Sequence, residues 1–133
     1  GPGEEEMGRN IAESMKQKSW IAPATTIAES IGLYKKLSLF VGSDSGPFHI
    51  CWALGIPTVS AWGPTDPNRN GAYSKNHEAV FHKLNCSFCW KRQCPLGTTE
   101  CMNKVTVQNM FDATKKIASG HIKMLISPQH STH

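Results

Sequence analysis

The sequence predicts an α/β protein with a Rossmann-like parallel sheet. Short apolar segments alternate with segments whose apolar residues recur at helical spacing, and glycine or proline closes several of the short segments. The chain has 133 residues, of which 39% are hydrophobic, so it is long enough for one ordinary domain with a buried core. We therefore expect a single globular domain over residues 1–133.

The first half of the chain predicts two helices. Residues 4–18 place Met7, Ile11 and Met15 four apart, between three glutamates at the start and two lysines at the end. These charges match the two ends of a helix dipole. In the second helix Ile27, Ile31 and Tyr34 recur at helical spacing, and Thr25 or Thr26 is the expected N-cap.

A strand, a turn and a third helix follow. Residues 37–41 are rich in strand-forming side chains and are bounded by Gly42. The pair Gly46-Pro47 is typical of a helix start, and this third helix is expected to run to Leu54.

The second half predicts two further strands and a long closing helix. Residues 58–62 form the first strand and residues 79–81 the second, with an irregular loop between them that begins at Gly63-Pro64. A cysteine-rich knuckle occupies residues 86–101, and a helix covers about residues 105–126. Alternation of short strands with helices favours parallel strands.

Composition and charge exclude some classes of protein. The longest uncharged window, residues 45–65, contains three glycines and three prolines, which excludes a membrane-spanning helix. Residues 67–133 carry nine basic and three acidic side chains, so this half favours an anionic partner: a phosphorylated ligand, an anionic lipid surface or nucleic acid. The first Met is residue 7 and no apolar leader follows, so we expect a piece of a longer or processed chain without a secretion signal.

The turn at residues 42–49 is the main candidate site. It lies where a strand ends and a helix begins, which is where open α/β sheets bind ligands. Free N–H groups of the first helical turn attract phosphate, Gly46 lets the backbone approach a ligand, and Ser45 adds a hydroxyl donor. Asp44 can accept hydrogen bonds from sugar hydroxyls, and His49 can donate one through its imidazole. Ordinary helix capping by Asp44 or Ser45 is the alternative.

A second loop, Gly63-Pro64-Thr65-Asp66-Pro67, follows the next strand and should lie on the same rim of the sheet. Thr65 and Asp66 are its candidate ligand-binding residues, and Arg69 offers a cation for phosphate. In the alternative interpretation the loop is a stiff turn in which Asp66 caps a short helix.

Four of the five cysteines form a C-x2-C-x4-C-x6-C cluster, whereas Cys51 lies alone in the third helix and is expected in the core. The cluster is compatible with a structural zinc site, with two disulfides or with free thiols. Its members are Cys86, Cys89, Cys94 and Cys101.

Three motifs in this order resemble the C-terminal, nucleotide-sugar-binding domain of glycosyltransferase family 9, the ADP-heptose:lipopolysaccharide heptosyltransferases. They are Asp44-Ser45-Gly46-Pro47-Phe48-His49, then Ala53-Leu54-Gly55-Ile56-Pro57-Thr58-Val59, then Gly63-Pro64-Thr65-Asp66-Pro67. The cysteine stretch is also similar to that of many family members. The resemblance runs from the start of the chain to the helix near Phe111.

The resemblance implies a truncated GT-B enzyme, of which this chain is the C-terminal, donor-binding half. Ser45 and Gly46 match positions that hold the donor diphosphate, and Asp44 matches the position that contacts the transferred sugar. Glu4 is similar to a ribose-binding glutamate, and Thr25 falls where the family lines the adenine pocket. The resemblance keeps the loop of Thr65 and Asp66 close to the donor without fixing the role of either residue. With His49, these candidates from the residue pattern complete the expected donor site.

The resemblance further implies an inverting transfer of heptose from ADP-heptose to the inner core of lipopolysaccharide, in the cytoplasm and at the inner face of the membrane. The general base is expected in the missing N-terminal domain, together with the site for the lipopolysaccharide precursor. This chain alone should therefore bind donor without catalysis, and no cofactor is required. Two other functions remain open: a metal-knuckle module that binds nucleic acid, and a GT-B-like nucleotide-sugar epimerase.

Overall fold

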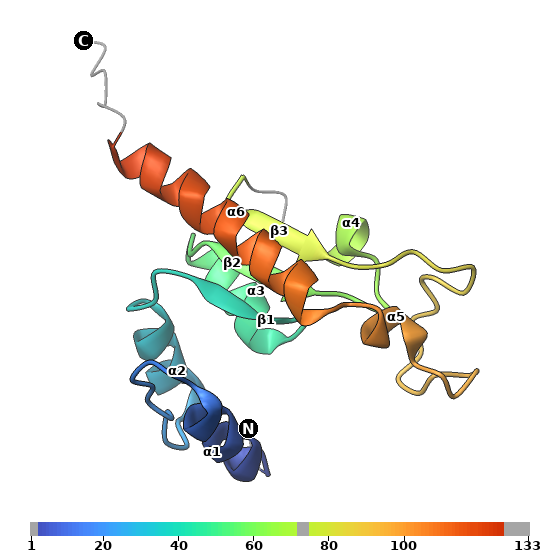
Figure 1. Cartoon of the computed structure of the whole chain (residues 1–133), viewed down its shortest axis with the longest axis horizontal. Coiled ribbons are helices and arrows are strands. Elements are labelled where there is room, and N and C mark those ends of the chain that lie inside the picture. Colours follow the sequence, from blue (N-terminus) through green and yellow to red (C-terminus); the bar gives the residue numbers. More distant parts are fainter. Residues whose placement is uncertain (1–2, 72–74, 127–133) are drawn as a thin grey trace. The chain divides into compact units, whose positions relative to one another are not determined.

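The structure is a computed structural model that describes residues 3–71 and 75–126, the last six of these through their backbone. The chain divides into two compact units, Gly1–Leu33 and Tyr34–His133. Figure 1 shows the course of the chain through both units.

The N-terminal unit contains helix α1 (Glu5–Ser14) and nearly all of helix α2 (Ile27–Tyr34). Helix α1 has the expected glutamates in its first turn but is shorter than the predicted segment 4–18. Met15 adopts an extended conformation and its N–H donates to the carbonyl of Ala12, which ends the helix. The predicted match of the two lysines to the helix C-terminus is therefore wrong, because both lie beyond it.

Helix α2 begins with a reciprocal cap. The Thr26 N–H donates to the Glu29 carboxylate at 2.8 Å, and the Glu29 N–H donates to the Thr26 hydroxyl at 3.3 Å. These bonds confirm Thr26 as the N-cap, one of the two residues that the sequence suggested. The backbone N–H and the hydroxyl of Thr26 both donate to the Glu29 carboxylate, and they lower the pKa of this carboxyl because they stabilise its ionised form.

The C-terminal unit is built on a three-stranded parallel sheet in the order β1 (Phe40–Ser43), β2 (Thr58–Ala61), β3 (His77–Val80). Phe40 pairs with Thr58 and Thr58 pairs with His77, so the three strands start level and end level. The predicted parallel sheet is confirmed. Strand β1 begins three residues later than predicted and strand β3 two residues earlier.

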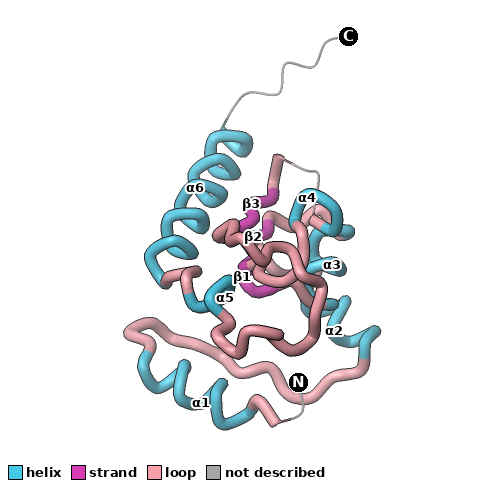
Figure 2. Tube along the Cα trace, turned by 90° about the vertical axis from the view of Figure 1, so that its right-hand side faces the viewer, coloured by secondary structure: helices cyan, strands magenta, loops and turns pink. Residues whose placement is uncertain are grey.

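Helices cover both faces of this sheet (Figure 2). Helix α3 (Gly46–Ala53) packs on β1 and β2, and the long helix α6 (Val107–Ile126) packs on β2 and β3 from the other side. Under α6 the core contains Val59, Ala113 and Ile117, with Leu39, Val80 and Met110 packed against them. The sheet is thus the middle of three layers, and its carboxyl ends lie together at one rim.

Two short helices lie in the connections of this unit: α4 (Pro67–Asn70) and α5 (Glu100–Asn103). The sequence reasoning did not predict α5, which falls inside the cysteine-rich segment. Helix α6 begins at Val107 instead of the predicted residue 105, because Thr106 and Asn109 form a reciprocal cap there. Within the described residues, none of the helices combines the length and the apolar character that crossing a membrane requires.

Candidate functional site

The carboxylate of Asp44 joins the two loops that the sequence singled out. Asp44 follows β1 directly, and its N–H donates to the carbonyl of Ala61 at 3.1 Å, which extends the pairing of β1 with β2 by one bond. Its Oδ1 lies 3.0 Å from Nε2 of His49, and its Oδ2 accepts a hydrogen bond of 2.6 Å from the Thr65 hydroxyl. The side chain of Asp44 is only 19% exposed. The structure therefore brings Asp44, His49 and Thr65 together, and it fixes the carboxylate from two sides.

The N-terminus of α3 opens beside this carboxylate. Ser45 has extended N-cap geometry, and its carbonyl accepts the first helical bond from His49 at 3.2 Å. Its side chain makes no capping bond to the described first turn of α3 but donates to the carbonyl of Ser43 at 3.1 Å. A Cβ built at Gly46 would meet no described atom within 4 Å, so a ligand has room to approach this backbone. These features fit an anion at the helix start.

Two buried aromatic residues, Phe48 and Trp62, lie next to His49, and the sequence reasoning missed this packing. The ring of Phe48 packs edge-on against His49 at 4.8 Å and against Trp62 at 5.5 Å. Both Phe48 and Trp62 are fully buried, and the Trp62 indole N–H donates to the Ser60 hydroxyl. The signal was available, because each aromatic residue adjoins a motif residue. This packing holds the His49 imidazole toward Asp44.

Asp66 and Arg69 are engaged in local structure. The Asp66 carboxylate accepts the N–H of Asn68 at 2.8 Å and caps helix α4, as the alternative interpretation of this loop expected. The guanidinium of Arg69 lies 5.2 Å from the ring centroid of Trp90, a cation–π contact. Donor binding by Asp66 and phosphate binding by Arg69 stay predictions.

Glu4 and Thr25 belong to the N-terminal unit. Glu4 occupies the N-cap position of α1, and the Thr25 hydroxyl lies 2.6 Å from the hydroxyl of Ser30. Their predicted contacts with ribose and adenine stay predictions.

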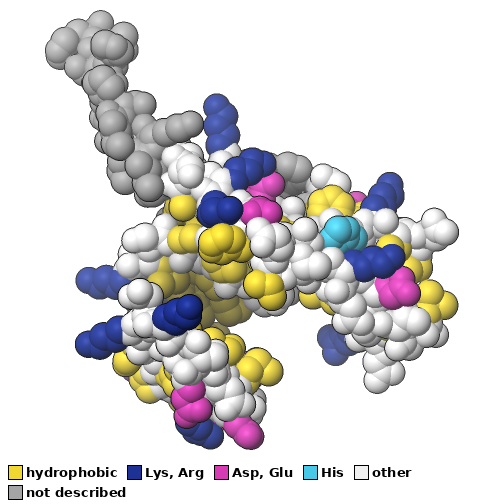
Figure 3. All heavy atoms as spheres, in the orientation of Figure 1, with side chains coloured by type: hydrophobic (Ala, Val, Ile, Leu, Met, Phe, Trp, Pro, Cys, Tyr) yellow, Lys and Arg dark blue, Asp and Glu magenta, His cyan; other side chains and the backbone are white. Residues whose placement is uncertain are grey.

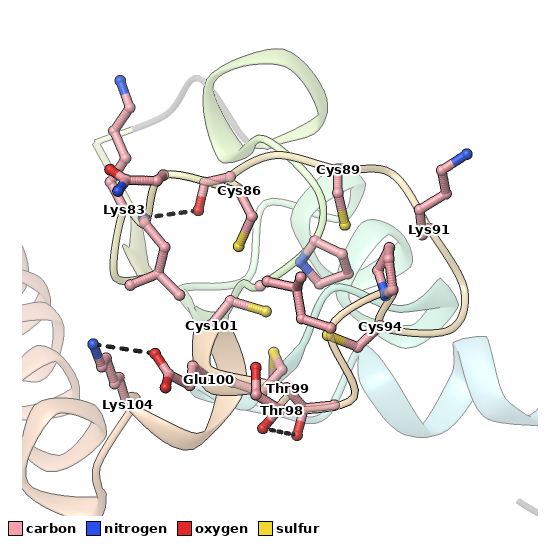
Figure 4. Close-up of a pocket in the computed structure, with 18 of the residues that line it drawn as sticks. Lys83, Cys86, Cys89, Lys91, Cys94, Thr98, Thr99, Glu100, Cys101 and Lys104 are labelled. Atoms are coloured by element: carbon pink, nitrogen blue, oxygen red, sulfur yellow. Dashed lines mark hydrogen bonds and ion pairs between the residues drawn. The ribbon is translucent and has the colours of Figure 1, made fainter.

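The cysteine cluster lines a pocket of about 730 Å³ in the C-terminal unit. All five cysteines are free; Cys51 is fully buried in α3, which confirms its predicted place in the core. Figure 4 shows the sulfur atoms of Cys86, Cys89, Cys94 and Cys101 pointing toward this pocket. Within the described residues no three histidine, cysteine or acidic side chains stand together as metal ligands do.

Gly63 and Pro64 form one wall of the cysteine pocket and also begin the loop that carries Thr65. The backbone N–H of Trp90 donates to the carbonyl of Pro64 at 2.9 Å. A side chain at position 63 would collide with the sulfur of Met102. The cysteine segment is therefore packed directly against the loop of the candidate site.

Basic side chains do not form a continuous stripe on the face that Figure 3 shows. Lys116 is paired with Glu78 at 2.9 Å, and Lys104 with Glu100 at 3.5 Å. On this face the basic side chains are therefore separate from one another, unlike the concentrated footprint of a nucleic-acid-binding face.

A family model described as glycosyltransferase family 9 (heptosyltransferase) matches residues 2–100. Lipooligosaccharide heptosyltransferase 2 of Campylobacter jejuni is 27% identical over 90% of this chain, which spans 39% of that protein. Lipopolysaccharide heptosyltransferase 1 of Pseudomonas aeruginosa is 28% identical over 73% of the chain, which spans 27% of its length.

Two solved structures are similar to this one. E. coli ADP-heptose lps heptosyltransferase II matches 91% of the chain and 35% of its own length, with a TM-score of 0.69 and 18% identity, which bears on the fold. E. coli heptosyltransferase WaaC with ADP matches 59% of the chain and 24% of its own length, with a TM-score of 0.53 and 29% identity.

Proposed function

Because the chain belongs to glycosyltransferase family 9, as its motifs predicted, we propose that it forms the donor-binding domain of an inverting heptosyltransferase. The proposed reaction moves heptose from ADP-heptose to the inner core of lipopolysaccharide. The observation that carries this proposal is the Asp44 carboxylate, held by His49 and Thr65 beside the open N-terminus of α3. The chain spans 39% of its Campylobacter jejuni relative, so the complete reaction also needs residues outside it.

We place the diphosphate of the donor at the start of α3. The first backbone N–H groups of a helix have no partner within the helix, so they can donate to an anion, and the helix dipole favours negative charge at the same point. Gly46 leaves the backbone accessible, and the Ser45 hydroxyl can rotate to donate to a phosphate oxygen. This arrangement is supported by the likeness to a heptosyltransferase whose structure is named as carrying ADP.

Asp44 is placed against the transferred sugar. A carboxylate offers about four lone-pair sites, and His49 and Thr65 occupy one on each oxygen. Asp44 can therefore accept sugar hydroxyls without releasing either neighbour. A carboxylate that is already oriented loses little freedom on binding, which makes it a specific sugar contact.

Departure of the nucleotide diphosphate is the step to which this chain contributes. Negative charge builds up on the leaving diphosphate, and the N–H groups of α3 stabilise it there, together with cations that we place in the complete enzyme. The acceptor hydroxyl must lose its proton to a general base, which we place in the part of the enzyme outside this chain. Under this proposal the helix terminus and basic side chains carry the phosphate charge, so catalysis needs no metal ion.

The other two functions have less support. The comparisons identify glycosyltransferases and give no support to a nucleic-acid-binding module or an epimerase. We place the reaction on the cytoplasmic side of the inner membrane, with the basic C-terminal half in peripheral contact with anionic lipid. A nucleotide-sugar donor and a lipopolysaccharide precursor as acceptor are the partners that this placement serves.

The test of donor binding compares ADP with AMP. We expect ADP to bind the 133-residue chain more tightly than AMP, with amide shifts in NMR spectra at Ser45 and Gly46, because the second phosphate reaches the helix start. Equal affinities, or shifts confined to other segments, would contradict the proposed diphosphate site.

The test of the sugar contact uses the full-length enzyme. Asp44→Ala should lower kcat/KM, because it removes about 2–4 kcal/mol of transition-state stabilisation. Loss of a helix cap alone would instead lower the free energy of unfolding by about 1 kcal/mol. Asp112→Ala, which removes an exposed carboxylate on α6, is the matched control and should retain activity. Unchanged kinetics with a lowered Tm would assign Asp44 to capping.

A further inference from the structure

We propose that residues 81–99, which link β3 to α5, form a surface that docks on the anionic headgroups of a lipid bilayer and holds the donor loop beside it. We call these residues the docking segment. The inference rests on the proposed function in one respect, namely that the acceptor is a lipopolysaccharide precursor and is therefore anchored in a membrane. Three features of the segment support it: its charge, its exposed apolar side chains and its contacts with the donor loop.

The docking segment carries positive charge and no negative charge. Residues 79–99 contain no aspartate or glutamate, whereas Lys83, Lys91 and Arg92 lie within them. All three side chains are exposed, and none of them forms an ion pair with another described residue. Figure 4 shows Lys83 and Lys91 pointing away from the cysteine pocket. These cations are therefore available to an anionic partner.

The lysines that follow the docking segment differ, because acidic side chains neutralise them. The pairs are Lys104–Glu100 at 3.5 Å, Lys115–Asp112 at 3.2 Å and Lys116–Glu78 at 2.9 Å. Arg69, by contrast, adds a fourth cation to the docking segment, since its guanidinium lies 5.2 Å from the ring centroid of Trp90 and makes no ion pair within the described chain. Charge complementarity thus favours an anionic surface at this segment over one at α6.

Two large apolar side chains of the docking segment are exposed beside these cations. Leu96 is 65% exposed, and Trp90, which directly precedes Lys91, is 43% exposed. Tryptophan is enriched where a membrane meets water, because its ring is apolar and its N–H is polar. An exposed leucine gains free energy when lipid covers it. Cations combined with exposed apolar side chains suit a lipid interface better than they suit a soluble anion.

The separation of the cations favours a bilayer over a nucleic acid. Lys83 precedes Lys91 by eight residues, and Figure 3 shows basic side chains that stand apart from one another. A nucleic acid presents its phosphates in a fixed row, whereas the headgroups of a fluid bilayer move laterally and can each meet a separate cation. The attraction to an anionic leaflet adds up over the basic side chains near it.

The docking segment lies at the rim of the sheet that carries the candidate site. Figure 1 shows it projecting beyond the carboxyl ends of the strands. The Trp90 N–H donates to the carbonyl of Pro64 at 2.9 Å, and the next residue, Thr65, donates to the Asp44 carboxylate. A bilayer bound by the docking segment therefore lies close to the donor loop. An acceptor anchored in that bilayer can reach the transferred sugar without leaving the lipid.

The experiment measures sedimentation of the 133-residue chain with vesicles of equal parts phosphatidylglycerol and phosphatidylcholine. The double variant Lys91→Gln/Arg92→Gln should lower the partition coefficient about thirtyfold, since each basic side chain near an anionic surface contributes about fivefold. Lys115→Gln/Lys116→Gln on α6 is the matched control, because it changes the net charge equally but removes lysines that are already paired. This control should keep most of the wild-type binding.

A second pair of variants tests the apolar contact. Leu96→Ser should lower the partition coefficient severalfold, whereas Val107→Ser should not, although Val107 on α6 is 87% exposed. In the wild-type chain, amide hydrogen exchange of residues 81–99 should become slower when the vesicles are added. Thermal unfolding of each variant verifies that these surface changes leave the fold intact.

Three results would overturn the proposal. The first is an equal loss of binding in the two double variants, which would assign binding to net charge alone. The second is slower exchange confined to residues outside 81–99. The third is release from the vesicles by inorganic pyrophosphate at constant ionic strength, which would assign the cations to a soluble phosphate group.

ADP binding measured on the same samples separates this inference from the proposed function. A wild-type chain that binds ADP but not the vesicles would refute docking and leave the donor site standing. A chain that binds the vesicles but not ADP would refute the donor site and leave docking standing.

Discussion

Thr65 is the residue that couples the two loops of the candidate site. Its hydroxyl donates to Asp44 Oδ2 at 2.6 Å, across 21 residues of sequence. A hydrogen bond to a charged group contributes about 1.5–3 kcal/mol, and here it also sets the direction of the carboxylate. Without this bond the Asp44 carboxylate would be oriented by His49 alone, through its Oδ1.

We expect Thr65→Val in the full-length enzyme to lower kcat/KM at least about tenfold, with a smaller effect on Tm, since the change removes only the hydroxyl. Thr65→Ser retains the donor and should stay near wild-type activity. Steady-state kinetics on both variants checks the expectation. Equal kinetics for the valine and serine variants would show that the bond does not orient Asp44.

His77 makes part of the stability depend on pH. Burial lowers the pKa of its imidazole, outweighing the bond to Thr58 and the charge of Glu78, which raise it. Its Nε2 is buried without a hydrogen-bond partner in the described part of the chain. The unfolded chain therefore takes up the proton more readily. The contribution of His77 to the free energy of unfolding is fully present above the unfolded pKa of about 6.5. It is lost as the pH falls below that value toward the folded pKa.

We expect urea unfolding to show a lower free energy of unfolding at about pH 5.5 than at about pH 7.5. His77→Gln should flatten this dependence, because the titrating group is gone. His82→Gln is the matched control, since His82 is exposed and its hydrogen bond among the described residues is to the Asn109 side chain. A pH dependence equally steep in wild type and His77→Gln would assign the effect to other groups.

At the scale of elements, helix α6 is the part that closes the core. Ile117 is 8% exposed and packs with Val59 of the central strand, whereas Phe111 on the same helix is 56% exposed. Both side chains are large and apolar but differ in burial. A comparison of their alanine variants therefore measures the effect of burial on stability.

We expect Ile117→Ala to lower the free energy of unfolding by about 2–5 kcal/mol, because it leaves a cavity against the sheet. Phe111→Ala should cost less than about 1 kcal/mol, since its ring lies at the surface under Lys115. Thermal or denaturant unfolding of the two variants provides the comparison. Similar losses for both would mean that α6 does not pack as described.

The elements could be predicted from the sequence where local signals decide. The alternating pattern identified the parallel sheet, and Gly46-Pro47 marked the start of α3. The end of α1 could not be found, because residues 15–18 carry good helix formers and no stop signal before Pro23. Helix α5 was missed because it is four residues long and lies among cysteines that drew a different interpretation.

The candidate site was predictable in part for the same reason. Asp44, Ser45 and Gly46 are consecutive, so one motif located all three. The bonds from His49 and Thr65 to the two oxygens of one carboxylate depend on how two loops meet, which no local pattern encodes. Asp66 shows the limit of residue type as a guide, since the same carboxylate suits a ligand and a helix cap.

On the scale of the whole molecule, charge divides the chain. Residues 67–133 have six more basic than acidic side chains, and residues 1–66 have two more acidic than basic. We expect the 133-residue chain to sediment with vesicles that contain anionic lipid at low salt and to be released as salt rises, because surface charges are screened. Vesicles of uncharged lipid are the control. Equal binding to both vesicles would contradict the proposed electrostatic contact with a membrane.

The three-layer arrangement also sets an order of assembly during synthesis. The sheet pairs strands about twenty residues apart, whereas the helix that covers Val59 supplies Ala113 and Ile117 more than fifty residues later. A nascent chain can pair β1, β2 and β3 before helix α6 leaves the ribosome. One apolar face of the sheet is then exposed to solvent and can bind other chains. Distant contacts of this kind slow folding and expose apolar surface to other chains. Helix α6, in the last quarter of the chain, is therefore the element that must pack before the nascent protein is protected from aggregation.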